Sequence, residues 1–228
     1  MNKPLAKNAI AFFDLDRTLI ANNSAFALLW QEIKIGHVGM SEFLGGLLWL
    51  IRYSFGGTNL ATAATTLVKA IKGHSEQKLQ ERMTDFYLKY MRPCLRPGAY
   101  AVLRMHRENG DRLVLLTSSS KYLSQLIVKD LELDDYLCTE LEIGADGLFT
   151  GNVIGYPCFG DGKLIAARNY ANEVKVDLQE CTFYTDSASD MPVLEAVGYP
   201  VAVNPDIRLR RIAKVKHWPI VDWGKPAK

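Results

Sequence analysis

The sequence has few of the residues that build metal clusters or covalent cross-links. It contains four cysteines and four histidines among 228 residues. Cys94, Cys138, Cys158 and Cys181 are far apart and form no Cys-x-x-Cys pair, so a zinc site is not expected. Because nothing in this spacing requires disulfides, the cysteines favour a reducing compartment.

Long apolar runs are also absent. The first apolar run ends in Asp14 and Asp16, whereas a signal peptide would need a longer uncharged stretch and a cleavage site. The most apolar stretch, Phe43–Ile51, has about half the length that spans a bilayer. We interpret it as a buried helix or a pocket wall in preference to a surface that contacts lipid. A cytoplasmic protein is therefore expected.

No dense block of one charge sign is present. The net charge is +2, which gives no sign of nucleic-acid binding. The nearest candidate is the basic run Arg208–Arg211 with Lys214 and Lys216. We interpret that run as a solvated helix face, so no nucleic-acid partner is expected.

What the chain does contain is an alternation of strand-like and helical patterns. Five short apolar runs predict buried strands: Ala9–Asp14, Arg112–Leu116, Tyr136–Ile143, Cys181–Thr185 and Pro200–Val203. Four segments with helical spacing lie between them: Pro97–Asn109, Tyr122–Leu131, Leu164–Val174 and Met191–Val197. This alternation predicts an α/β fold, a Rossmann-like, doubly wound parallel sheet with helices on both faces.

Two stretches interrupt the alternation. Residues 21–92 indicate several helices broken at glycines, with no convincing strand. We therefore predict a helical cap domain over 21–92, inserted into a core formed by 1–20 and 93–228. A smaller excursion between Gly144 and Pro157 has glycine-rich turns and alternating residues, which predicts a β-hairpin.

Polar clusters follow the predicted strands in a fixed order. Asp14 and Asp16 follow the first, Thr117 the second, and Asp186 with Asp190 a later one, while Lys163 opens a helix. Ligands bind at the carboxyl ends of strands in such sheets. Carboxylates, a hydroxyl and an ammonium gathered there would suit Mg²⁺-dependent phosphate transfer.

Each cluster taken alone has an ordinary structural explanation. The Asp-x-Asp pair and Asp190 can cap helices, Thr117 can be a helix N-cap, and Lys163 can be a surface lysine. The functional interpretation makes Asp14 a nucleophile and Asp16 a general acid/base. It places Thr117, in preference to the neighbouring Ser118, on a phosphate oxygen. It also places an anion beside Lys163, because a cation at the N-terminus of a helix is unfavourable without one.

The ordered set resembles the haloacid dehalogenase superfamily of phosphohydrolases, with Asp-x-Asp-x-Thr first and Asp-x-x-x-Asp last. The insertion after the first motif is similar to subclass IB, which is related to phosphoserine phosphatase. The resemblance implies attack by Asp14 and acid/base work by Asp16. It implies Mg²⁺ ligation by Asp14, the backbone carbonyl of Asp16 and Asp186.

The same resemblance assigns the remaining polar residues. Thr117, Ser118 and Lys163 would bind the phosphoryl group, and Asp190 would support the metal's water and orient Lys163. Phosphoserine phosphatases carry a Glu where this chain has Asn23, which cannot pair with a cationic amine as a charge. Their last motif typically contains Asp-Gly-Ala-Asn-Asp, which here is Asp-Ser-Ala-Ser-Asp. Phosphoserine is therefore not the expected substrate.

Several functions remain open from the sequence. The expected one is a phosphatase for small soluble phosphomonoesters, such as amino-alcohol phosphates (histidinol phosphate, for example) or sugar phosphates. Alternatives are a lipid-phosphate phosphatase, such as one for phosphatidylglycerol phosphate, suggested by Phe43–Ile51, and a phosphotransferase or mutase on the same scaffold. A non-catalytic metal-binding protein is disfavoured, because no catalytic part is missing from the motifs.

Overall fold

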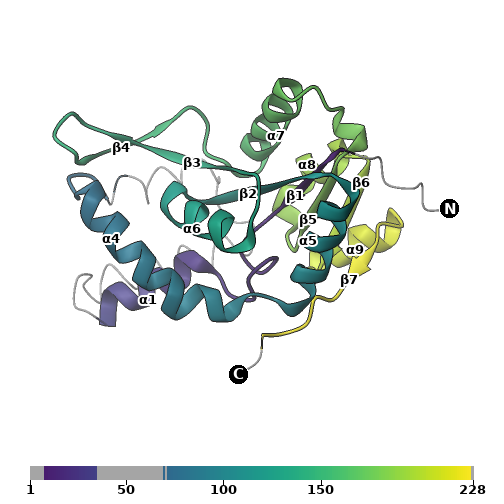
Figure 1. The fold of residues 1–228 in the computed structure, drawn as a ribbon, viewed down its shortest axis with the longest axis horizontal. Helices are drawn as coiled ribbons and strands as arrows, with labels where there is room; N and C mark the ends of the chain where they lie inside the picture. Colours follow the sequence, from purple (N-terminus) through teal and green to yellow (C-terminus); the bar gives the residue numbers. More distant parts are fainter. Residues whose placement is uncertain (1–7, 35–68, 70, 227–228) are drawn as a thin grey trace.

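A seven-stranded sheet forms the centre of the part of the protein that the structure describes (Figure 1). The computed structural model describes residues 8–34, 69 and 71–226. The strand order is β4-β3-β2-β1-β5-β6-β7. The strands are β1 (Ile10–Phe13), β2 (Arg112–Ser120), β3 (Asp135–Ile143), β4 (Phe149–Ile154), β5 (Thr182–Thr185), β6 (Tyr199–Val203) and β7 (Ile220–Val221).

The sheet is parallel except at one edge. β1 pairs in parallel with β2 on one side and β5 on the other, whereas β3 and β4 form an antiparallel hairpin. All four residues of β1 are buried, as expected for a parallel strand covered on both faces. β1 occupies the centre of this arrangement, and the sheet continues on both sides of it. The predicted α/β fold with a doubly wound parallel sheet is confirmed.

Seven α-helices lie in the described part of the chain. They are α1 (Ser24–Lys34), α4 (Glu76–Phe86), α5 (Pro97–Asn109), α6 (Lys121–Leu131), α7 (Asp161–Glu173), α8 (Met191–Ala196) and α9 (Ile207–Val215). The predicted bounds of α5 agree with the structure. Pro97 occupies its first turn, and Gly110 ends it in the left-handed conformation with φ 80°, which glycine adopts without steric cost.

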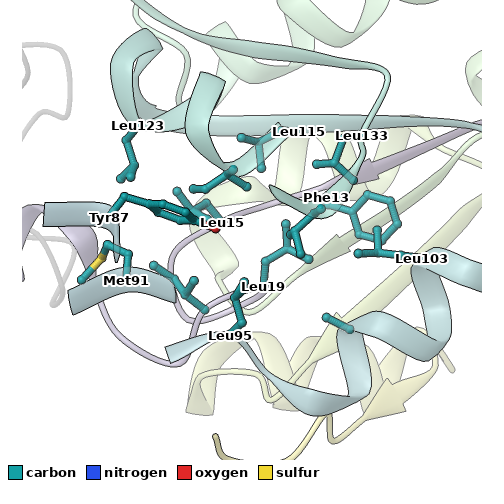
Figure 2. Close-up of a cluster of buried hydrophobic side chains, with 14 of the residues drawn as sticks. Phe13, Leu15, Leu19, Tyr87, Met91, Leu95, Leu103, Leu115, Leu123 and Leu133 are labelled. Carbon is teal, nitrogen blue, oxygen red and sulfur yellow. The ribbon is translucent and has the colours of Figure 1, made fainter. Parts of the chain in front are cut away.

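Alternate residues of β1 face two separate cores. Phe13 joins the core beneath α5 and α6, where it lies near Leu103 and Leu115 (Figure 2). Phe12 joins the second core, which α7, α8 and α9 cover. Asp14 therefore directly follows a strand whose backbone is fixed by packing on both faces of the sheet.

Some expected boundaries were wrong. β2 continues to Ser120, so Thr117 and Ser118 lie inside the strand and not after it, at a shift in register against β3. α7 begins at Asp161, earlier than its apolar spacing indicates. The hairpin is present, but its first strand is β3 itself, and it projects from the sheet edge above α4 (Figure 1).

The segment predicted to be a cap is described only in part. α1 and α4 lie within 21–92, and α4 runs on through a π-helical turn, Tyr87–Met91. Met83 and Met91 pack into the same core as Phe13. The division at 21–92 stays a prediction, and Phe43–Ile51 lies outside the described residues. Within those residues, no helix has the length and apolar character needed to cross a membrane.

Candidate active site

The carboxyl ends of β1, β2 and β5 lie side by side and carry three of the predicted residues. Phe13 pairs with Leu115 of β2 and with Tyr184 of β5. Asp14 follows Phe13 directly, and Thr117 and Asp186 lie two residues beyond the paired positions. The register therefore brings these three residues to one edge of the sheet.

A buried ammonium joins two carboxylates at this edge. Lys163 Nζ donates to Asp14 Oδ1 at 2.6 Å and to Asp190 Oδ2 at 2.8 Å. The three side chains are 4%, 9% and 4% exposed, respectively. Lys163 lies in the first turn of α7, so its charge opposes the helix dipole. The two carboxylates compensate for that cost.

Thr18, which had no predicted role, links the first and last motifs. Its hydroxyl donates to Asp14 Oδ2 at 3.0 Å and accepts the backbone N–H of Asp186 at 3.0 Å. The Thr185 hydroxyl donates to Asp190 Oδ2 at 2.7 Å. The threonine of the Asp-x-Asp-x-Thr pattern was the available signal for this contact.

The loop after β5 is also tied to the start of α9. The backbone N–H of Asp206 donates to the carbonyl of Asp186 at 2.9 Å, and Asp206 Oδ2 accepts the N–H of Ala188 at 3.1 Å. Asp206 caps α9 through its other oxygen, which accepts the N–H of Leu209. This second residue without a predicted role fixes the loop that carries Asp186.

Asp16 points toward α1 and not toward the lysine. Its carboxylate accepts the N–H of Ser24 at 2.6 Å and the Ser24 hydroxyl at 3.0 Å. Burial raises the pKa of Asp16, and the two hydrogen bonds from Ser24 oppose that rise. A carboxyl with a raised pKa suits a group that must give up and regain a proton.

Thr117 and Ser118 differ in exposure. Thr117 is buried, and its hydroxyl accepts the N–H of Ser119 at 3.1 Å, whereas Ser118 is exposed. The N-cap of α6 is Ser120. The alternative explanation of Thr117 as that helix's N-cap is therefore wrong. Both residues stay candidates for binding a phosphoryl oxygen.

The buried charges at this edge are not balanced. Burial raises the pKa of Asp14 to about 6, although Lys163 opposes the shift. Burial, together with the charges of Asp14 and Asp190, raises the pKa of Asp186 well above its ordinary value. Burial acts to lower the pKa of Lys163, but Asp14 and Asp190 raise it overall. Of these three acidic groups, Asp14 and Asp190 contact the ammonium of Lys163, and Asp186 does not.

A divalent cation fits this imbalance. Mg²⁺ needs only one or two protein carboxylates besides water and substrate, and Asp14 with Asp186 would supply them. Among residues 8–34, 69 and 71–226, no three His, Cys, Asp or Glu side chains gather as a metal site. The Asp16 carboxylate is engaged by Ser24, as described above.

The family follows from a match over most of the chain. The model of the haloacid dehalogenase-like hydrolases matches residues 11–195, and the chain belongs to this family. A solved protein of unknown function from Bordetella pertussis Tohama I has a similar structure. Its TM-score is 0.86 at 29% identity, over 96% of this chain and all of the other.

Two similar sequences carry phosphatase names. The histidinol-phosphatase of Neisseria meningitidis serogroup C (strain 8013) is 31% identical over 218 residues, which cover 94% of this chain and 98% of that protein. Phosphoserine phosphatase SerB1 of Mycobacterium tuberculosis (strain ATCC 25618 / H37Rv) is 31% identical over 224 residues, 96% and 72% of the two chains. Family and relatives together identify this chain as an enzyme of the phosphatase type.

Proposed function

We propose that this protein is a Mg²⁺-dependent phosphomonoesterase that forms an aspartyl-phosphate on Asp14 and acts on a small organic phosphate. The observation that carries the proposal is the buried contact of Lys163 with both Asp14 and Asp190. A purely structural ion pair needs one carboxylate for one ammonium. The second carboxylate and the nearby Asp186 leave negative charge that a metal ion would balance.

The reaction runs in two displacements. A carboxylate oxygen of Asp14 attacks phosphorus, the ester P–O bond breaks, and Asp16 gives its proton to the leaving oxygen. Asp16 then takes a proton from a water molecule, which attacks phosphorus and breaks the bond to Asp14. Free phosphate leaves, and both carboxyl groups regain their starting states. Dividing the transfer in this way replaces one difficult step with two easier ones.

The remaining residues hold charge and orientation. Lys163, Thr117 and Ser118 bind phosphoryl oxygens, and Thr18 fixes the second oxygen of Asp14 through its hydrogen bond. When bound, Mg²⁺ screens the carboxylate against the negatively charged substrate. Asp14, Asp186 and the backbone carbonyl of Asp16 are the groups that would hold it. Donors placed before reaction in this way account for much of the expected rate.

Asn23 stands where phosphoserine phosphatases carry a Glu. Its side-chain oxygen accepts the N–H of Phe26 at 2.9 Å in the first turn of α1. A neutral amide engaged in this way offers no charge to an ammonium beside a carboxylate, so phosphoserine is disfavoured. The two named relatives act on different compounds by name and are equally identical to this chain. Their names therefore do not rank the substrates, and we place small soluble phosphomonoesters, histidinol phosphate and sugar phosphates among them, ahead of phosphoserine.

The test is phosphate release from p-nitrophenyl phosphate, histidinol phosphate, sugar phosphates and phosphoserine. Wild type and Asp14→Asn are compared with Mg²⁺ and with EDTA. We expect turnover by wild type that requires Mg²⁺ and is lost in the variant. Turnover that survives in Asp14→Asn would refute the nucleophile. Added acceptor alcohols would yield new phosphate esters if the enzyme were a phosphotransferase.

A further inference from the structure

A buried arginine lies next to the first motif and has no place in the mechanism above. Arg96 precedes α5 and is 8% exposed. Its Nε donates to the carbonyl of Arg17 at 3.2 Å, and its Nη1 donates to the carbonyl of Gly224. Its backbone N–H donates to the carbonyl of Leu19 at 2.9 Å. The residue therefore holds two carbonyls of the turn that follows Asp14.

The turn has an uncommon conformation at the point where Arg96 holds it. Arg17 has φ 62°, a left-handed value that few residues other than glycine adopt. Its N–H donates to the carbonyl of Asn22 at 3.1 Å. The peptide groups on its two sides belong to Asp16 and Thr18, so a rotation at Arg17 would displace both. Such conformations persist only where surrounding contacts hold them.

The other end of the tether is anchored against the core. Trp223 is 4% exposed, and its ring lies 5.3 Å from that of Tyr184. The Trp223 carbonyl accepts the N–H of Gly98 at 2.9 Å. A Cβ at Gly98 would lie 2.6 Å from Trp223 Cα, so only glycine permits this approach. Gly224, the next residue, therefore offers Arg96 a fixed acceptor.

An arginine suits this position better than a lysine. The rigid guanidinium fork donates in two directions at once, whereas an ammonium is a single point charge. Burial lowers the pKa of Arg96, and the charges of Asp222 and Asp186 oppose that shift. The charges of Arg96 and Asp186 therefore stabilise each other, and the charge of Arg17 also acts to lower the pKa of Asp186.

We propose that Arg96 is a positioning residue that holds the Asp14–Thr18 turn in its reactive geometry by tethering the Arg17 carbonyl to the C-terminal segment. It acts through Arg17 and does not touch the substrate. The inference rests on the proposed function insofar as the turn carries the nucleophile. The tether itself depends only on the contacts above.

The test compares Arg96→Met with Arg107→Met. Arg107 lies at the other end of α5 and likewise donates to backbone carbonyls, those of Leu131 and Glu132, at 3.1 Å each. A small displacement of reacting groups lowers kcat strongly, so we expect Arg96→Met to lose roughly 10- to 100-fold in kcat with little change in KM. Arg107→Met should keep the wild-type kcat. Arg96→Lys, which retains the charge without the fork, should fall between.

Amide hydrogen exchange provides a measurement that does not depend on activity. In Arg96→Met the peptide covering residues 14–22 should exchange faster, while other peptides keep the wild-type rate. Arg107→Met should leave that peptide unchanged. If Arg96→Met does not fold, kcat and amide exchange are measured for Arg96→Lys and compared with those of wild type and Arg107→Met.

Two results separate this proposal from the proposed function. Unchanged kcat and unchanged exchange at residues 14–22 in Arg96→Met would overturn the positioning role. A wild type that hydrolyses none of the phosphate esters would overturn the proposed function. In that second case, faster exchange at residues 14–22 in Arg96→Met would still establish the tether.

Discussion

Lys163 and Asp14 are 149 residues apart in the sequence, yet Lys163 Nζ lies 2.6 Å from Asp14 Oδ1. The contact joins the start of α7 to the end of β1 across the carboxyl edge of the sheet. Since Asp190 binds the same ammonium at 2.8 Å, the lysine is the shared counterion of two motifs. Its removal should therefore affect stability as well as catalysis.

Lys163→Met should destabilise the protein strongly. Removing one member of a buried ion pair leaves uncompensated carboxylates, which costs about 3–5 kcal/mol. Urea unfolding in EDTA measures the free energy of unfolding. Added Mg²⁺ should recover part of the loss, because it supplies the missing positive charge. The control is Lys89→Met, whose pair with Asp85 is more than half exposed and should give no resolvable loss.

Without metal, stability should fall as pH rises toward neutrality. The pKa of Asp14 is raised from 3.8 to about 6 by burial, so the folded protein keeps a proton that the unfolded chain has already released. The folded state then binds more protons between about pH 4 and 6, and the free energy of unfolding falls across that window. Urea titrations in EDTA test this expectation. A rise across the window would contradict it. Asp14→Asn or Mg²⁺ should make the fall shallower, and the raised pKa of Asp186 should account for part of what remains in Asp14→Asn.

Gly162→Ala should impair catalysis through its neighbour Lys163. A Cβ at Gly162 would lie 1.9 Å from the carbonyl oxygen of Pro157, so the start of α7 must shift. The matched control is Gly198→Ala, whose Cβ would lie 1.9 Å from the carbonyl oxygen of Gln179. Both should lose about 1–3 kcal/mol of stability, but only Gly162→Ala should lower kcat when measured well below its unfolding temperature. Equal kcat values in Gly162→Ala and Gly198→Ala would count against the expected effect on Lys163.

Tyr184→Phe should lower stability and leave kcat unchanged. Burial lowers the pKa of His106, so its neutral ring donates from Nδ1 to Asp111 at 2.7 Å and accepts the Tyr184 hydroxyl at Nε2 at 2.8 Å. Loss of the hydroxyl leaves a buried acceptor unpaired, which costs about 1–3 kcal/mol. We expect kcat to be unchanged because the contact of Tyr184 with Asp14 is through the backbone: the Tyr184 carbonyl accepts the Asp14 N–H at 2.9 Å. Phenylalanine retains this carbonyl. A large drop in kcat without loss of stability would contradict this separation.

The parts of the fold that local sequence encodes were predictable. β1 is an unbroken apolar run, and α5 is bounded by Pro97 and Gly110. β7 could not be predicted from the sequence, because a strand of two residues has no periodicity of its own. It exists through pairing with β6, where Ala202 lies opposite Ile220. The extension of β2 to Ser120 likewise depends on its partner strand β3.

The site divides in the same way. The order of the motifs along the chain predicted that Asp14, Lys163, Asp186 and Asp190 share one edge of the sheet, and their chemical roles stay predictions. The threonine of the Asp-x-Asp-x-Thr pattern was the available signal for the contacts of Thr18 with Asp14 and Asp186. The turn that makes these contacts has a left-handed arginine, and no sequence pattern indicates that conformation. A buried Arg96 was equally hidden, since arginine is mostly exposed.

The most direct test of the account is the stereochemical course at phosphorus. The substrate is p-nitrophenyl phosphate made chiral with oxygen isotopes and sulfur, and turnover takes place in isotopically labelled water with Mg²⁺. Two in-line displacements, first by Asp14 and then by water, predict overall retention of configuration. Inversion would show a single direct attack by water and would contradict the proposed role of Asp14.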